Sequence, residues 1–171
     1  NNQVYDSRDN CNAIIHTATN TLIFGCCKTN IPNSVTNIGN SAFESCQSLT
    51  AITIPDSVTS IGDFAFSFCD SLASVIIPNS VVNIGEGAFR CCESLTTINI
   101  PDSVTNIRRL AFSFCKSLSS ITIPNGVTTI EENAFEYCES LTSITIPASV
   151  TNIDLCAFFY CHSLTTIIVD E

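Results

Sequence analysis

The sequence predicts a solenoid built from six stacked units with a 23-residue period, and two observations support this prediction. The dipeptide Ile-Pro recurs with this period and accounts for all six prolines of the chain. Valine, isoleucine, phenylalanine and leucine recur at the same interval. Such a period is typical of repeat proteins, in which each unit buries its apolar side only against its neighbours. The dipeptides begin at Ile31, Ile54, Ile77, Ile100, Ile123 and Ile146.

One unit illustrates the course predicted for all of them. Residues 49–54 are rich in β-branched side chains and precede Pro55, which cannot donate a ladder hydrogen bond, so a strand ends there. After a turn, residues 58–61 form a second short extended piece. We expect one short helical turn at 62–69, where apolar residues recur at helical spacing. Stacked copies then form a parallel sheet with strands about 4.8 Å apart and share one core.

The two ends of the chain depart from the period. Two short apolar stretches, 13–15 and 22–24, predict an N-terminal hairpin that covers the first rung. We therefore divide the chain into an N-terminal hairpin or capping module, residues 1–30, and six 23-residue repeats, residues 31–171. At the other end, Val169 replaces the recurring Ile-Pro, and we expect an unprotected edge of the kind left when a longer array is cut.

The composition limits the classes of partner. Acidic residues outnumber Lys and Arg by 16 to 6, which gives a formal net charge of -10. A surface of this sign repels phosphate backbones and anionic lipid, so we expect no nucleic acid as a partner. No apolar run approaches the ~20 residues of a membrane helix, so we expect no membrane insertion within this segment. The chain contains no methionine, which indicates a mature piece or an excised segment.

Six of the eleven cysteines form one column of the repeat. We expect them to be buried free thiols, because side chains that all point into the core have poor geometry for bridging. A disulfide, if one exists, joins Cys11 to Cys26 or to Cys27. Cys156, Cys161 and His162 have no second matching pair of ligands, so we predict no metal site. The column consists of Cys46, Cys69, Cys92, Cys115, Cys138 and Cys161.

The sequence has no arrangement typical of catalysis. Its two histidines, His16 and His162, lie far apart, and neither is near a glycine-flanked nucleophile. Carboxylates are scattered over the turns rather than paired, and the six glycines form no phosphate-binding loop. We therefore predict a protein that is not an enzyme and needs no cofactor.

The candidate binding residues point outward from the longer strand of each unit. In the pattern L-x-x-I-x-I they occupy the third and fifth positions, which alternate with buried positions. They are small, hydroxyl-rich and uncharged. They predict either a broad, shallow protein-binding surface or a ladder suited to strand formation and solubility. The set is Ala51, Thr53, Ser74, Ile76, Thr97, Asn99, Ser120, Thr122, Ser143, Thr145, Thr166 and Ile168.

An aromatic column interrupts the monotony of the repeat. Ser45 and Cys91 occupy the same position in the two remaining units. The rings either pack against the flank of the solenoid or, if they are exposed, form a lateral contact surface. The column contains Phe68, Phe114, Tyr137 and Tyr160.

Four of the six basic residues gather in the middle two units. They either bind an acidic partner or neutralise the charges of Glu86, Glu93 and Asp102. We favour the second interpretation, a balance of charge within the protein. The four are Arg90, Arg108, Arg109 and Lys116.

The repeat resembles a known family. The pattern of residues 49–54 is similar to the first part of the leucine-rich-repeat motif. The string A-F-x-x-C-x-S-L-T-x-I-x-I-P resembles the treponemal, or BspA-like, class, and the resemblance covers residues 31–169. Residues 4–15 also resemble a module interspersed among such repeats. One departure is that Ser, or Gly126, stands where the motif usually has Asn.

The resemblance implies a fold and a function. The implied fold is an α/β repeat: a right-handed leucine-rich-repeat solenoid with a parallel sheet on its concave face and short helical or irregular convex segments. The implied function is a non-enzymatic, protein-binding module of an adhesin at the cell surface. Its partners would be proteins of a host or of neighbouring cells, including extracellular matrix. The alternative is a structural spacer or stalk within a larger repeat protein.

Overall fold

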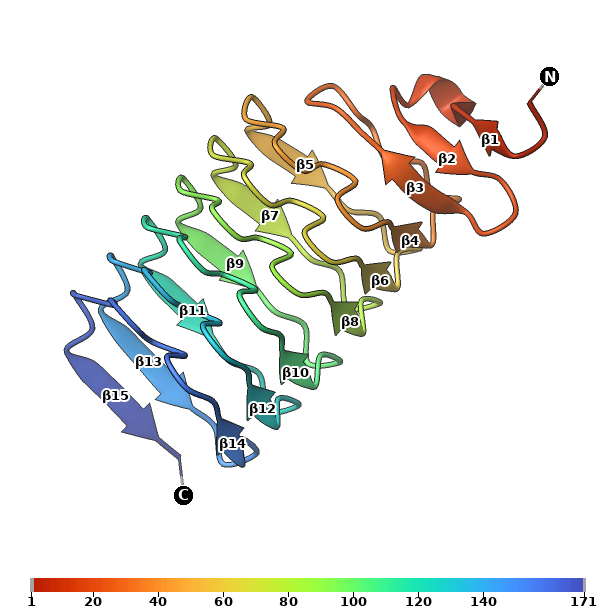
Figure 1. The fold of residues 1–171 in the computed structure, drawn as a ribbon. Coiled ribbons are helices and arrows are strands. Elements are labelled where there is room, and N and C mark those ends of the chain that lie inside the picture. Colours follow the sequence, from red (N-terminus) through yellow and green to blue (C-terminus); the bar gives the residue numbers. More distant parts are fainter. Residues whose placement is uncertain (1, 171) are drawn as a thin grey trace.

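Two rows of parallel strands, which we call the long ladder and the short ladder, run along the length of the protein, and every repeat contributes one strand to each (Figure 1). Strand pairing is interrupted once in each row, between residues 120–122 and 143–146 in the long ladder and between residues 83–84 and 106–107 in the short ladder. The structure is a computed structural model that describes residues 2–170. Strands that are one unit apart in sequence are neighbours in space, so the chain advances by one rung with each repeat. The predicted solenoid of stacked repeats is therefore confirmed.

The long ladder contains the longer strand of each unit, which a proline follows in every unit but the last. Its strands pair in register, so Ile52 lies opposite Val75, and Val75 lies opposite Ile98. Because this offset equals the period of the repeat, every column of the sequence becomes a column in space. The strands are β5 (Ala51–Thr53), β7 (Ser74–Ile76), β9 (Thr97–Asn99), β11 (Ser120–Thr122), β13 (Ser143–Ile146) and β15 (Thr166–Val169).

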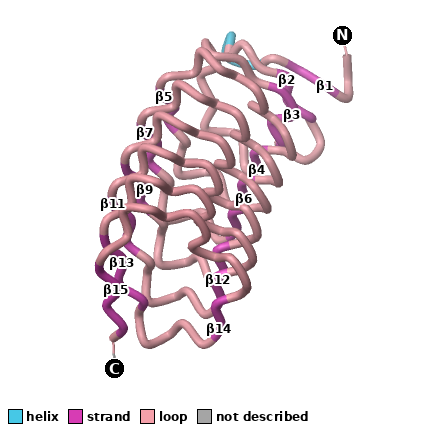
Figure 2. The backbone as a smooth tube through the Cα atoms, turned by 60° about the vertical axis from the view of Figure 1, so that its left-hand side comes forward, coloured by secondary structure: helices cyan, strands magenta, loops and turns pink. Residues whose placement is uncertain are grey.

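The short ladder contains the second extended piece of each unit. Threonine hydroxyls reinforce it: Thr59 Oγ1 donates to the Thr36 carbonyl at 3.2 Å, and Thr151 Oγ1 donates to the Thr128 carbonyl at 3.4 Å. Figure 2 shows these strands as a second line along the tube. They are β4 (Asn37–Ile38), β6 (Ser60–Ile61), β8 (Asn83–Ile84), β10 (Asn106–Ile107), β12 (Thr129–Ile130) and β14 (Asn152–Ile153).

The segment that follows the short ladder in each rung is a series of turns. The helical turn expected at 62–69 is absent, and the fold is almost entirely β and turn rather than α/β. Phe64 and Phe68 have φ angles of 54° and 58°, and left-handed residues interrupt a right-handed helix. Their amides bond to the next rung instead: Phe64 donates to the Glu86 carbonyl and Phe68 to the Arg90 carbonyl, both at 2.8 Å.

The N-terminal residues form the predicted hairpin, which extends the short ladder. β2 (Ile14–His16) and β3 (Thr21–Phe24) are antiparallel, and β1 (Tyr5–Asp6) pairs with β2. A 3-10 helix, η1 (Arg8–Asn10), connects β1 to β2. β3 pairs in parallel with β4, so the hairpin lies against the first rung. Its glycine, Gly25, leaves the space that the Phe43 ring occupies.

The core is a continuous stack of apolar columns. The recurring phenylalanines lie face to face, with ring centroids 5.0–5.8 Å apart along the whole stack. Isoleucine, valine, alanine and leucine columns pack around them and are almost fully buried. The stacked rings are Phe43, Phe66, Phe89, Phe112, Phe135 and Phe158.

The last rung is more exposed than the others. Ile167 in β15 is 59% exposed, whereas Ile121 and Ile144 in the same column are buried. Leu155, in the last series of turns, is 81% exposed. No helix among residues 2–170 has the length and apolar character needed to span a membrane.

Candidate functional site

The structure brings the twelve predicted strand residues together on one surface, which we call the strand face. All twelve are exposed, and from β5 to β13 they alternate with buried residues. They form two columns because the strands pair in register: Ala51 lies opposite Ser74, and Thr53 lies opposite Ile76. The strand face consists of Ala51, Thr53, Ser74, Ile76, Thr97, Asn99, Ser120, Thr122, Ser143, Thr145, Thr166 and Ile168.

Two shallow hollows lie on the strand face. The first, of about 360 Å³, covers β5 and β7 and includes Thr29 and Asn30 at its border. The second, of about 250 Å³, covers β9 and β11. Ile76 is 76% exposed and lines the first hollow. No charged side chain lines either hollow, so this face suits neutral contacts made by shape and by hydrogen bonds to hydroxyl and amide groups.

A further hollow, which is not among the predicted sites, lies on the N-terminal module. It has a volume of about 540 Å³, and Tyr5, Ile14 and Ile23 supply its apolar lining. The alternation within the hairpin strands is the signal that predicts this surface. Because Ile15 and Leu22 point into the core, their neighbours Ile14 and Ile23 must point outward.

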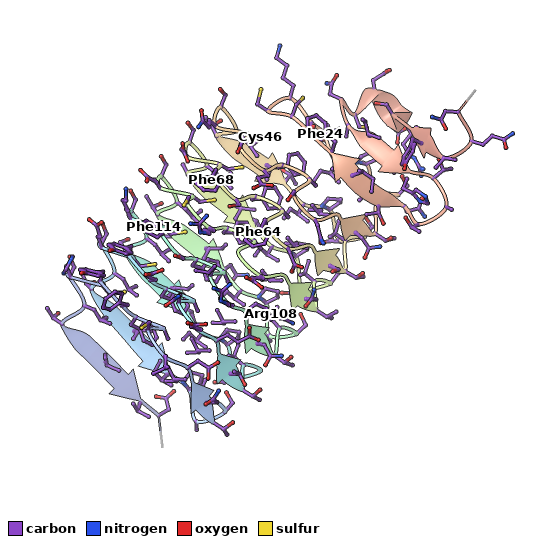
Figure 3. The ribbon with its side chains drawn as sticks, in the orientation of Figure 1. Phe24, Cys46, Phe64, Phe68, Arg108 and Phe114 are labelled. Atoms are coloured by element: carbon purple, nitrogen blue, oxygen red, sulfur yellow. The ribbon has the colours of Figure 1, made fainter. Side chains whose placement is uncertain are left out.

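The aromatic column lies on the flank where the turns lead into the long ladder. Figure 3 shows Phe68 and Phe114 on this side. Phe114 stacks on Tyr137 with a centroid distance of 4.4 Å, and Tyr137 stacks on Tyr160 at 4.5 Å. Phe68 is 37% and Tyr160 is 42% exposed. We call this set, Ser45, Phe68, Cys91, Phe114, Tyr137 and Tyr160, the flank column.

Arg90 completes the stack where the flank column has no ring. Its guanidinium carbon lies 5.1 Å from the Phe68 centroid and 6.0 Å from the Phe114 centroid, so it bridges the gap above the small Cys91. This contact is a cation–π interaction on both sides. From the sequence we expect Arg90 to balance acidic charge. The structure instead gives it an aromatic environment, which only the lateral neighbours of Cys91 reveal.

The other three clustered basic residues do pair with acidic residues of adjacent rungs. Arg109 contacts Glu86 at 2.6 Å and Lys116 contacts Glu93 at 2.7 Å, as the balance predicts. Arg108 instead pairs with Glu131 at 3.3 Å. Asp102, the third expected counter-charge, has no ion pair within residues 2–170. Because these ion pairs are exposed, each of them stabilises the fold only slightly. Together they join the rung that carries Arg108, Arg109 and Lys116 to acidic residues of the rungs on both sides.

The cysteine column is buried in its inner rungs and joins consecutive rungs through hydrogen bonds. Cys69 Sγ donates to the Phe43 carbonyl and Cys115 Sγ donates to the Phe89 carbonyl, both at 3.2 Å. All eleven cysteines are free thiols in the structure, so no bridge joins Cys11 to Cys26 or Cys27. Burial raises the pKa of the Cys69 thiol to about 12. Thiols this hard to ionise are poor nucleophiles and poor metal ligands.

The histidines occupy unrelated places. His16 Nδ1 lies 2.9 Å from Thr19 Oγ1 in the hairpin, and the His162 ring packs edge-on against Tyr160 at the other end of the molecule. Neither contacts a serine or cysteine nucleophile among the described residues. Within residues 2–170 no three His, Cys, Asp or Glu side chains converge in a way that could hold a metal ion.

Comparisons with known proteins agree with the geometry. The model of the BspA type leucine rich repeat region matches the chain in six copies, over residues 23–138 and 82–171. A leucine rich cell surface protein of Faecalibacterium prausnitzii is 34% identical with a TM-score of 0.75, and the match covers 99% of this chain and 40% of that protein. No curated protein matches the chain.

Two further solved structures share the architecture. A leucine-rich repeat protein of Eubacterium ventriosum is 28% identical with a TM-score of 0.71, and the match covers 90% of this chain and 51% of that protein. A leucine rich repeat protein of T. pallidum is 23% identical with a TM-score of 0.69, covering 94% and 86%, and shares the fold. The chain thus spans less than two thirds of the Faecalibacterium and Eubacterium proteins.

Proposed function

Because the chain belongs to the BspA-type leucine-rich repeat family, we propose that it is a non-enzymatic protein-binding module of an adhesin-like surface protein. Its partners are proteins of a host or of neighbouring cells, including extracellular matrix. The observation that carries this proposal is the strand face: twelve exposed, uncharged side chains on in-register strands, hollowed in two places. The description of the Faecalibacterium protein as a cell surface protein supports an extracellular location.

The strand face is too narrow to form the whole of a stable interface with a protein. We propose that the long ladder lines the concave side of a right-handed solenoid, where a partner meets a rigid sheet. Six strands at a spacing of about 4.8 Å span roughly 25 Å. With so few outward-facing residues on each strand, the face is narrow and offers less than the ~800 Å² that each partner buries in a stable complex. Contacts on the flank column therefore extend the proposed interface.

A binding experiment tests the strand face. Residues 1–171 are applied to a panel of immobilised extracellular-matrix proteins, and binding is measured by surface plasmon resonance. Replacing Thr53, Asn99 and Thr122 together with Arg should abolish binding, because three long cationic side chains then cover both hollows. The matched control replaces Val82, Asn83 and Asn152 with Arg.

The control changes the net charge equally but lies in and beside the short ladder, where the three residues are exposed. It should leave binding unchanged. Loss of binding in both triple variants would point to charge rather than to the strand face. Retention of binding in the Thr53, Asn99 and Thr122 variant would refute the proposed surface.

The alternative function, a spacer, is favoured by one observation. Hydroxyls next to the strand face are engaged within the molecule: Thr96 Oγ1 donates to the Ala73 carbonyl, and Ser119 Oγ donates to the Thr96 carbonyl, both at 3.4 Å. Such hydroxyls use their proton to join rungs and can only accept a hydrogen bond from a partner. A spacer tolerates deletion of one whole unit, residues 77–99, with full function, whereas a binding module loses affinity because its surface is shortened.

A further inference from the structure

The flank column contains two positions without a ring, and the chain fills only one of them. At Cys91 the guanidinium of Arg90 takes the place of the ring and lies between Phe68 and Phe114. A guanidinium can do so because it is planar, delocalised and attracted to the negative face of an aromatic ring. This rung therefore shows, within the molecule, how the column accepts an arginine.

The second position without a ring is Ser45, one rung before Phe68. Ser45 is exposed and small. The residue before it, which corresponds to Arg90, is Glu44, and this exposed carboxylate takes part in no ion pair within residues 2–170. Arg90 covers one face of Phe68, but no ring or cation of the described chain stacks on the other. The space above Ser45 thus has an aromatic face and a carboxylate but no cation.

Polar groups near Phe68 are also left without partners. Three buried side-chain polar atoms in the described chain make no hydrogen bond, and two of them belong to neighbours of Phe68: Ser67 Oγ and Arg90 Nε. Ser67 is fully buried and precedes Phe68 in sequence. Two rungs later the corresponding hydroxyl, that of Ser113, does find a carboxylate, Glu136, at 3.3 Å. Buried polar groups are normally satisfied, so these two atoms are exceptions, although neither is a partner for a second guanidinium: Arg90 Nε is itself a donor and Ser67 is out of reach of solvent.

From these observations we infer that the space above Ser45 binds an arginine side chain of a partner protein. The guanidinium stacks on the free face of Phe68, as Arg90 does on the opposite face, and pairs with the carboxylate of Glu44. Arginine fits better than lysine, because only a planar guanidinium can stack and form a bidentate contact with a carboxylate at the same time. The net charge of -10 attracts a basic partner over longer range. The inference rests on the proposed function and specifies one chemical feature of the partner.

Nuclear magnetic resonance titration with N-acetyl-arginine methylamide tests the site, because the method detects weak binding residue by residue. Saturable shifts are expected at Ser45 and Phe68. Ser45→Phe should abolish them by filling the space. An aromatic side chain fits this backbone, since Ser45 and Phe68 have φ angles of 61° and 58°. Glu44→Gln should weaken binding about two- to fivefold, the range of an exposed ion pair. Glu139→Gln, which removes a charge several rungs away, should have no effect.

Two comparisons decide between the site and general attraction to an acidic protein. N-acetyl-citrulline methylamide, which has the same shape without the charge, should produce no saturable shift. N-acetyl-lysine methylamide should bind more weakly than the arginine probe. Shifts that persist in the Ser45→Phe variant, or that spread over all acidic residues, would overturn the inference. So would equal binding of the lysine probe. This titration does not involve the strand face, so its failure would not change the result expected in the matrix-binding experiment.

Discussion

The Phe stack gives a quantitative test of how the rungs hold together. Phe89 is fully buried and lies between Phe66 and Phe112, with centroids 5.3 and 5.8 Å away. Phe89→Ala removes the ring from the middle of the stack and leaves a cavity. The backbone ladders on both sides of the core prevent this cavity from collapsing. A buried Phe→Ala change costs about 3–5 kcal/mol. For a chain of this length, the melting temperature should fall by roughly 2–4 °C for each kcal/mol.

The matched variant is Phe158→Ala in the last rung. Phe158 is only partly buried and stacks on a single ring, Phe135, at 5.3 Å. It therefore loses fewer contacts and leaves a space that water can enter, so we expect less than half the loss, about 1–2 kcal/mol. Urea unfolding followed by far-ultraviolet circular dichroism measures both changes. Equal losses for the two variants would refute the view that stability comes from stacking on both neighbouring rungs.

Two further predictions concern backbone fit and thiol ionisation. Gly126→Ser restores the residue most common at this position of the repeat. It should nevertheless destabilise the fold by about 1–3 kcal/mol in urea unfolding, because a Cβ atom would collide with the Asp102 carbonyl oxygen. An unchanged or higher stability would contradict the structure. At pH 8 a thiol reagent should modify exposed Cys27 rapidly and buried Cys69 only after unfolding. Because the folded pKa of Cys69 is raised from 9.0 to about 12, its contribution to stability is complete below pH 9 and is lost as the pH rises toward 12. The free energy of unfolding of Cys69→Ala should therefore decline less steeply above pH 9 than that of the unaltered protein, by up to about 1.4 kcal/mol per pH unit. If the two proteins lost stability identically as the pH rises, this linkage would be excluded.

The surfaces of this protein differ in what they offer a partner. The strand face is neutral and made mostly of small side chains, whereas the flank column supplies tyrosine and phenylalanine, and Arg90 lies beside it. Tyrosine and arginine are among the residue types that dominate the energy of many interfaces. Arg90 is held by Phe68 and Phe114 rather than by a carboxylate. A partner that reaches from the strand face to the flank therefore gains both shape complementarity and a few strong anchors.

The 23-residue period by itself determined the rungs, their register and most of the core. Once strands stack at a constant offset, each column of the sequence must become a column in space, so Phe89 has to lie between Phe66 and Phe112. The outward position of the strand-face residues followed in the same way, because side chains alternate along a strand. The hairpin was also predictable from its two apolar stretches.

Only the tertiary structure decided the path of the turns and the environment of Arg90. Residues 62–69 have the apolar spacing of a helix, but each rung offers carbonyl groups to the amides of the rung before it. Every second amide of this segment donates to the next rung, whereas the amides between them bond three residues back within the turns. Left-handed residues such as Phe64 and Phe68 alternate with right-handed ones, so no continuous helix forms. The place of Arg90 likewise depends on rings of the rungs on either side of Cys91, a lateral contact that local sequence does not contain.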